Sequence, residues 1–125
     1  MTRISEEHRF IFEQSVFLPM VLTVLSRDLD IINTAPFKLK KPYANLIDQT
    51  MRKVQKDLYQ IKVKMKEEKM KAMQLERDEA FTLFLFIING WEEKHNYFNP
   101  RIRTEVSKLL EKYLSGSNYY SESNP

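Results

Sequence analysis

Apolar residues recur along the middle of the chain with alternating gaps of four and three residues. The positions that form this seam are Ile47, Met51, Val54, Leu58, Ile61 and Met65. Such spacing places one apolar residue per turn on the same side of a helix, and so narrow a seam is typical of helices that pack on helices. At roughly three heptads the seam is marginal for a free coiled coil. We therefore expect it either to pack within the chain or to pair between subunits.

The apolar pattern predicts a first helix from about Ser5 to Ile32. Ser5 suits the N-cap position, where its hydroxyl accepts a backbone N–H. Pro19 removes one backbone donor inside the helix, which predicts a kink or a break near Ser15–Leu18. The pattern does not distinguish a closed core from an exposed groove along Val16–Leu25.

A buried segment follows the seam and is ambiguous in type. We expect a third helix from Asp78 to about Tyr97, with Trp91 as a core anchor, although Phe81–Ile88 also has the composition of a strand. Helix is preferred because no second strand-like run is evident to pair with it. The intervening residues 67–77 are interpreted as a bend or a frayed continuation of the seam helix.

The last predicted helix has clear start signals at its first residues. Asn99 is expected to cap it and Pro100 to occupy its first position. Its apolar stripe consists of Ile102, Val106, Leu109, Leu110 and Tyr113. The prediction is thus an all-α four-helix bundle, up-and-down or irregular, with a single domain at residues 1–114. Residues 115–125 have no apolar period and are expected to form a disordered tail.

Composition excludes several classes of function and sets the expected compartment. The chain of 125 residues has no cysteine, hence no disulfide framework, thiolate zinc site or cysteine nucleophile. Glu6 and Glu7 do not suit an export signal, and no apolar run approaches the ~20 residues of a membrane span. These features predict a cytoplasmic protein.

Charge is unevenly distributed along the chain. Between Lys38 and Lys71 there are eleven Lys or Arg and only four Asp or Glu. This basic segment, with Tyr43 and Tyr59 available to stack on bases, is compatible with nucleic-acid binding. However, its cations are spread around the helical wheel, which favours an ordinary solvated helix face.

Candidate catalytic chemistry is sparse. Glu92 and His95 form a Glu-x-x-His element, of which the di-iron carboxylate bundles need two copies. The other histidine, His8, is preceded three residues earlier by a serine, so the second copy is missing. Asp48 and Glu13 are possible extra ligands without a fixed position, and no nucleophile elbow is present. We expect no catalytic residue, metal or cofactor.

Four segments carry a resemblance to a known family. They are Phe17–Val21 with Ser26–Asp30, Ala35–Lys40, and His95–Arg103. Over nearly the whole chain, from about Met1 to Leu114, the sequence resembles the YhjD-like proteins of endospore-forming bacteria. The resemblance implies a compact bacterial domain and supplies no catalytic residues.

The function favoured by these observations is a noncatalytic cytoplasmic interaction or regulatory protein that works through helix packing. Its partner would be another protein or a second copy of itself. The first alternative is a nucleic-acid-binding protein that uses residues 38–71. The second alternative is a metal-dependent helical-bundle enzyme.

Overall fold

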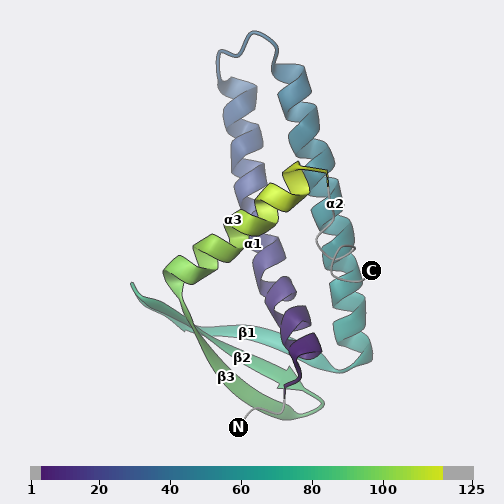
Figure 1. Ribbon diagram of the computed structural model, residues 1–125, viewed down its shortest axis with the longest axis vertical. Helices are drawn as coiled ribbons and strands as arrows, with labels where there is room; N and C mark the ends of the chain where they lie inside the picture. Colours follow the sequence, from purple (N-terminus) through teal and green to yellow (C-terminus); the bar gives the residue numbers. More distant parts are fainter. Residues whose placement is uncertain (1–3, 117–125) are drawn as a thin grey trace.

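Two long helices, a three-stranded sheet and a shorter helix make up the fold of residues 4–116, the part of the chain that the computed structural model describes (Figure 1). The elements are α1 (Glu6–Thr34), α2 (Lys40–Glu67), β1 (Met70–Arg77), β2 (Phe81–Ile88), β3 (Trp91–Phe98) and α3 (Asn99–Leu114). α1 and α2 form a hairpin whose far end projects beyond the sheet, while α3 crosses α1. The architecture is α+β, so the predicted all-α four-helix bundle is wrong.

The sheet replaces the helix that the sequence predicted from Asp78 to Tyr97. Along β2, buried Thr82, Phe84 and Phe86 alternate with half-buried Leu83 and Leu85, which is the two-residue period of a strand. β1 and β3 pair with β2 on either side in antiparallel orientation.

Short turns at both ends of β2 fix this meander. Asn89 and Gly90 have φ values of 49° and 83° between β2 and β3, as the type I′ hairpin turn requires. At the other end, the Asp78 Oδ1 atom accepts the N–H groups of Ala80 at 2.8 Å and Phe81 at 2.7 Å. These hydrogen bonds hold the pKa of Asp78 below its usual range. The segment 67–77, expected as a bend or frayed helix, is largely β1.

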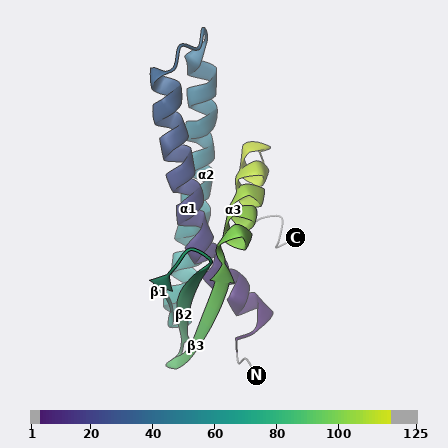
Figure 2. The same ribbon diagram turned by 90° about the vertical axis from the view of Figure 1, so that its left-hand side faces the viewer.

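α1 confirms its predicted start but not its predicted break. The Ser5 Oγ atom accepts the His8 N–H at 3.1 Å, as expected of an N-cap. Helical structure continues through Pro19 without interruption. Figure 2 shows the first turns of α1 leaning away from the axis of the remainder, so the chain accommodates the proline by bending.

The seam of α2 faces the interior of the same chain. Five of its six residues are buried, and Met51 is half-buried against the same core, which contains Phe12 and Val21 of α1. The alternative that this seam pairs between subunits is therefore wrong. α2 needs no second copy, because α1 supplies its apolar partner.

α3 begins at the predicted residues with a different role for Asn99. The N-cap position is Phe98, and Asn99 is the first helical residue. The Asn99 side chain accepts the Thr82 hydroxyl at 2.7 Å and donates to the Asp78 carbonyl at 2.9 Å. It therefore fastens α3 to the start of β2. After α3, Ser115 and Gly116 form a turn; the rest of the predicted tail lies outside the described residues.

One hydrophobic core joins the helices to the inner face of the sheet. The Phe12 ring of α1 stacks on Phe86 of β2 with a centroid separation of 4.6 Å. Two buried tyrosine hydroxyls donate to carboxylates across elements, Tyr97 to Glu13 and Tyr113 to Asp57, each at 2.6 Å. Burial and the adjacent carboxylate raise the pKa of both tyrosines.

Candidate functional site

A groove follows the free edge of β1. β1 pairs with β2 alone within the described sheet, so its other edge carries no strand. Two adjoining cavities of about 690 and 620 Å³ lie along this edge and share Met20, Thr23 and Gln74. We name the two cavities together the edge groove. It extends from the end of α2, past the middle of α1, to α3.

The unpaired edge of β1 borders this groove. Five consecutive residues, Met70–Gln74, line it, so side chains from both faces of the strand border the same space. The Asn89 N–H donates to the Lys69 carbonyl at 3.0 Å, which fixes the alternation of the antiparallel ladder. Ala72 and Gln74 then direct their N–H and C=O groups away from β2, toward the groove.

α1 forms the opposite wall and leaves apolar side chains at the floor. Val16, Met20 and Val24 recur every four residues on the groove side of this helix. Phe17 and Leu18, between them in sequence, are buried in the core. The sequence did not distinguish a closed core from an exposed groove along Val16–Leu25. In the structure, one side of this segment is closed core and the other side borders a groove.

The charged residues of the edge groove are all basic. Lys62, Lys66 and Lys71 stand at one end, and three arginines stand at the other end, Arg27, Arg77 and Arg103. The lining includes no Asp or Glu. Within residues 4–116, none of these six cations takes part in an ion pair. Their charge is available to an anionic ligand.

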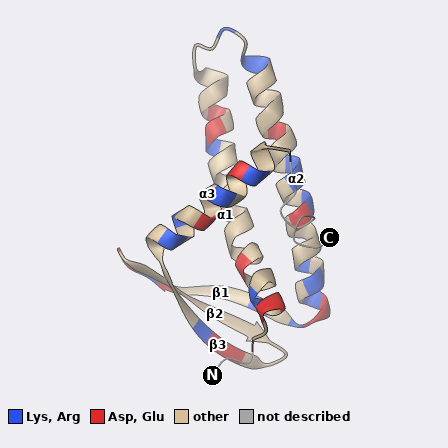
Figure 3. Cartoon of the chain, in the orientation of Figure 1, with Lys and Arg blue, Asp and Glu red and all other residues tan. Residues whose placement is uncertain are grey.

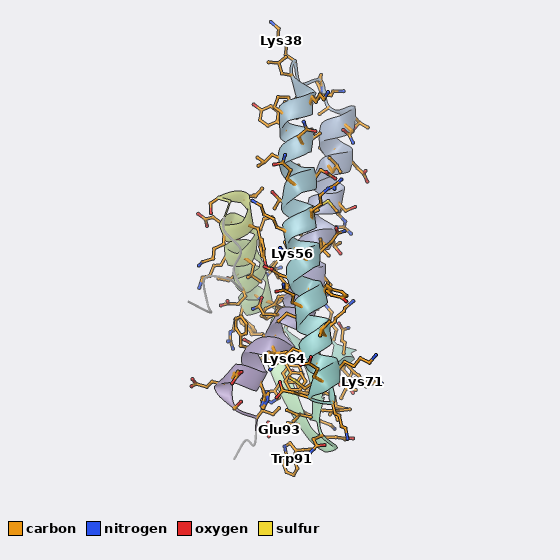
Figure 4. The ribbon with its side chains drawn as sticks, turned by 90° about the vertical axis from the view of Figure 1, so that its right-hand side faces the viewer. Lys38, Lys56, Lys64, Lys71, Trp91 and Glu93 are labelled. Atoms are coloured by element: carbon orange, nitrogen blue, oxygen red, sulfur yellow. The ribbon has the colours of Figure 1, made fainter. Side chains whose placement is uncertain are left out.

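The structure divides the basic segment that the sequence singled out. Lys38 lies at the projecting end of the hairpin, and Lys71 lies at the sheet end, with Lys56 and Lys64 between them (Figure 4). Figure 3 shows Lys and Arg distributed along the length of α2. Tyr43 and Tyr59 are exposed outside the groove. Residues 38–71 do not form one surface.

Sequence reasoning missed the arginine end of the groove. Arg27, Arg77 and Arg103 come from α1, β1 and α3. No spacing in the sequence links residues so far apart. Only the packing of α3 beside α1 and the end of β1 assembles them.

The candidate metal motif is dispersed by the sheet. Glu92 and His95 belong to β3, where residues three apart point to opposite faces. His95 instead contacts Glu93, with 3.0 Å between Nε2 and Oε1. Glu93 also accepts the Trp91 indole N–H at 2.9 Å, and Trp91 lies 38% exposed near the β2–β3 turn instead of anchoring the core (Figure 4).

The other proposed ligands have structural partners. His8 contacts Glu68 at 3.0 Å between Nε2 and Oε1, and this hydrogen bond lowers the pKa of Glu68. Asp48 pairs with Arg52 at 3.0 Å, and Glu13 accepts from Tyr97. In the described part of the chain, no three His, Cys, Asp or Glu side chains are grouped to hold a metal ion.

Comparisons with known proteins identify relatives but no mechanism. A family model described as YhjD protein matches residues 3–118. The Bacillus subtilis (strain 168) protein named "Uncharacterized protein YhjD" is 46% identical over 114 residues, which cover 91% of this chain and 95% of that protein. No solved structure matches. Across residues 4–116, no helix has the length and apolar character needed to cross a membrane.

Proposed function

This chain belongs to the YhjD family, and for it we propose a noncatalytic interaction function in which the edge groove binds an extended acidic segment of a partner protein. The observation that carries the proposal is the meeting of a free strand edge with six unpaired cations in one groove. Location in the cytoplasm and the absence of enzymatic activity stay predictions.

The free edge of β1 supports a strand-addition mode of binding. An extended peptide that pairs with an edge strand gains main-chain hydrogen bonds, and its alternate side chains occupy pockets on the two sides. The outward N–H and C=O groups of Ala72 and Gln74 are available for such pairing. α1 runs along the same space and would cover the added strand from one side.

Charge and apolar lining together define the chemistry of the ligand. Cations at both ends of the groove favour carboxylates at both ends of a bound segment. The apolar lining, which includes Met20, Met65 and Phe84, favours apolar side chains at alternate positions. The segment that fits best therefore alternates Asp or Glu with apolar residues in an extended conformation.

The test is fluorescence anisotropy with a labelled ten-residue peptide that alternates Glu with Val or Leu. We expect saturable binding at low salt that weakens as salt rises, because the cations are at the solvent-accessible rim. A peptide of the same amino-acid sequence whose backbone amides are N-methylated should bind at least about tenfold more weakly, since it lacks the N–H groups needed to pair with β1.

Matched protein variants locate the binding site. The double substitution Arg77→Ala with Arg103→Ala should weaken binding, whereas Lys56→Ala on α2, outside the groove, should leave it unchanged. No binding at low salt would rule the proposal out. Nucleic acid that co-purifies and is removed by salt would instead support the alternative of a nucleic-acid-binding protein.

A further inference from the structure

The outer face of the sheet, opposite to the hydrophobic core, is unusually apolar. β2 directs Phe81, Leu83, Leu85 and Ile87 to this face, because the alternate residues of the strand point inward. An antiparallel sheet with one solvated face normally shows polar residues at the outward positions. All four outward positions of β2 are apolar instead.

The neighbouring strands extend this apolar surface. Met73 of β1 lies opposite Leu85, and Phe98 of β3 lies opposite Phe81 with its ring centroid 5.4 Å away. Met73 and Phe81 are each 40% exposed, and Phe98 is 49% exposed. The described parts of α1 and α3 lie on the other side of the sheet (Figure 2), where the core residues point. The outer face is thus open.

Charges of both signs flank the apolar surface, Lys71 and Glu76 on β1 and Glu92 and Lys94 on β3. The register aligns Lys71 of β1, Ile87 of β2 and Glu92 of β3 in one row across the outer face. Both charged residues are exposed, and neither forms an ion pair within the described residues. If a second copy of this row is placed on the first in the opposite order, each basic residue faces an acidic one and the two apolar residues face each other.

We propose that the outer face is the interface of a homodimer, in which two sheets pack face to face about a two-fold axis parallel to β2. This rotation places each β2 over the partner's β2, so that Leu85 and Ile87 meet their own copies. It also places β1 of one chain over the partner's β3. Lys71 then faces the partner's Glu92, and the reciprocal pair forms on the other side.

A second copy fits this face better than it fits the edge groove. The edge groove carries six cations and no carboxylate, so two copies would repel each other there. The outer face is apolar at its centre and carries two charges of each sign at its sides, Lys71 and Glu76 on β1 and Glu92 and Lys94 on β3, so two copies of this face carry no net charge against each other. The two surfaces share Lys71 and Met73, but the dimer proposal rests on the four outward residues of β2, none of which lines the edge groove.

The first test is molar mass by light scattering and sedimentation over a range of protein concentrations. We expect a dimer that dissociates on dilution. Leu85→Arg should weaken dimerisation by at least about a hundredfold, because it buries two like charges at the axis. Circular dichroism should show that this variant retains its fold. Tyr59→Arg, on the exposed side of α2, is the matched control and should remain dimeric.

The second test addresses the two-fold arrangement itself. K71E alone and E92K alone should each weaken the dimer, by about tenfold, because each places like charges opposite one another twice. An equimolar mixture of the two variants should restore dimerisation, since both interchain pairs are then of opposite sign. A monomer at every concentration, a dimer unaffected by Leu85→Arg, or a mixture that stays monomeric would each overturn the proposal.

Discussion

The two faces of the sheet are built from alternate residues of the same three strands, yet they meet different surroundings. On the inner face, Phe84, Phe86 and Tyr97 are buried against the helices. On the outer face, Leu83 and Leu85 are only half-buried although they are equally apolar. β2 therefore has the hydrophobicity of a strand enclosed on both sides, while the described chain encloses one side only.

The difference shows that hydrophobicity by itself does not identify the core face of a strand. What distinguishes the faces is the chemistry of the neighbouring strands. Inward positions of β3 contribute His95 and Tyr97, which contact Phe86 and Phe84 through their rings. Outward positions contribute charged residues such as Glu92 and Lys94. The neighbouring strand therefore supplies aromatic rings that pack on the buried face, and charged residues that border the open face.

The largest effect should come from truncating a side chain on the inner face. Phe86→Ala removes a ring that is 1% exposed and stacked on Phe12, and should lower the free energy of unfolding by about 3–5 kcal/mol. Leu85→Ala, on the outer face, should cost less than about 1.5 kcal/mol. Urea denaturation at low protein concentration measures both values without a contribution from dimerisation. Equal losses would mean that the outer face is also enclosed within one chain.

A smaller effect should follow from removing one hydroxyl on the inner face. Tyr97→Phe deletes the hydrogen bond to Glu13, whose carboxylate then keeps the Arg9 side chain at 3.8 Å. The loss of this hydrogen bond should lower the free energy of unfolding by about 1–2 kcal/mol. Asn96→Ala, on the same strand but the outer face, should stay within about 0.5 kcal/mol of the parent. Thermal denaturation of the two variants side by side tests this; a loss in the control would contradict the assignment of faces.

The turn between β2 and β3 should affect both faces together. Gly90 has a φ of 83°, so Gly90→Ala should cost about 1 kcal/mol through backbone strain. Asn89→Gly, at a φ of 49°, should be tolerated because glycine adopts that conformation freely. Hydrogen exchange should then show β2 amides opening more readily in Gly90→Ala alone. Unchanged exchange in that variant would contradict a strained turn.

The smallest effect should be a response to alkaline pH that is confined to the inner face. Tyr97 has a raised pKa in the folded state, so the stability linked to it is complete below the ordinary pKa of 10.0 and is lost as pH rises above that value. By pH 10.5 the loss should be about 0.8 kcal/mol for this tyrosine. Tyr97→Phe should remove that part of the pH dependence, whereas exposed Tyr59→Phe should not; identical pH profiles for the two variants would exclude this role.

The helices could be predicted from the sequence, but the sheet could not be predicted with the same reasoning. Ser5, the α2 seam and Pro100 placed α1, α2 and α3 closely, because each signal is local. Phe81–Ile88 was recognised as strand-like, and helix was preferred only because no partner strand was evident. β1 and β3 escaped notice because they are edge strands that expose most of their residues. The available signal was Asn89-Gly90, a hairpin turn directly after an apolar run.

The candidate site was predictable only in part. The basic character of residues 62–71 was visible, and it places three lysines at one end of the groove. The three arginines at the other end, and the opposite charges of Lys71 and Glu92 across the sheet, depend on strand register and helix packing. The strand register is set by the positions of the turns. Because Asp78–Tyr97 was predicted as a helix, neither the turns nor the register could be predicted.

The connectivity of the meander has a consequence for how the chain acquires its fold. The α1–α2 hairpin and the β1–β2–β3 sheet each join elements that follow one another directly in sequence, so each closes only short loops. Short loop closure costs little entropy and permits rapid formation. The buried Tyr113–Asp57 and Tyr97–Glu13 contacts, by contrast, join the late part of the chain to its helical hairpin. We therefore expect two quickly formed units whose docking limits the rate of folding.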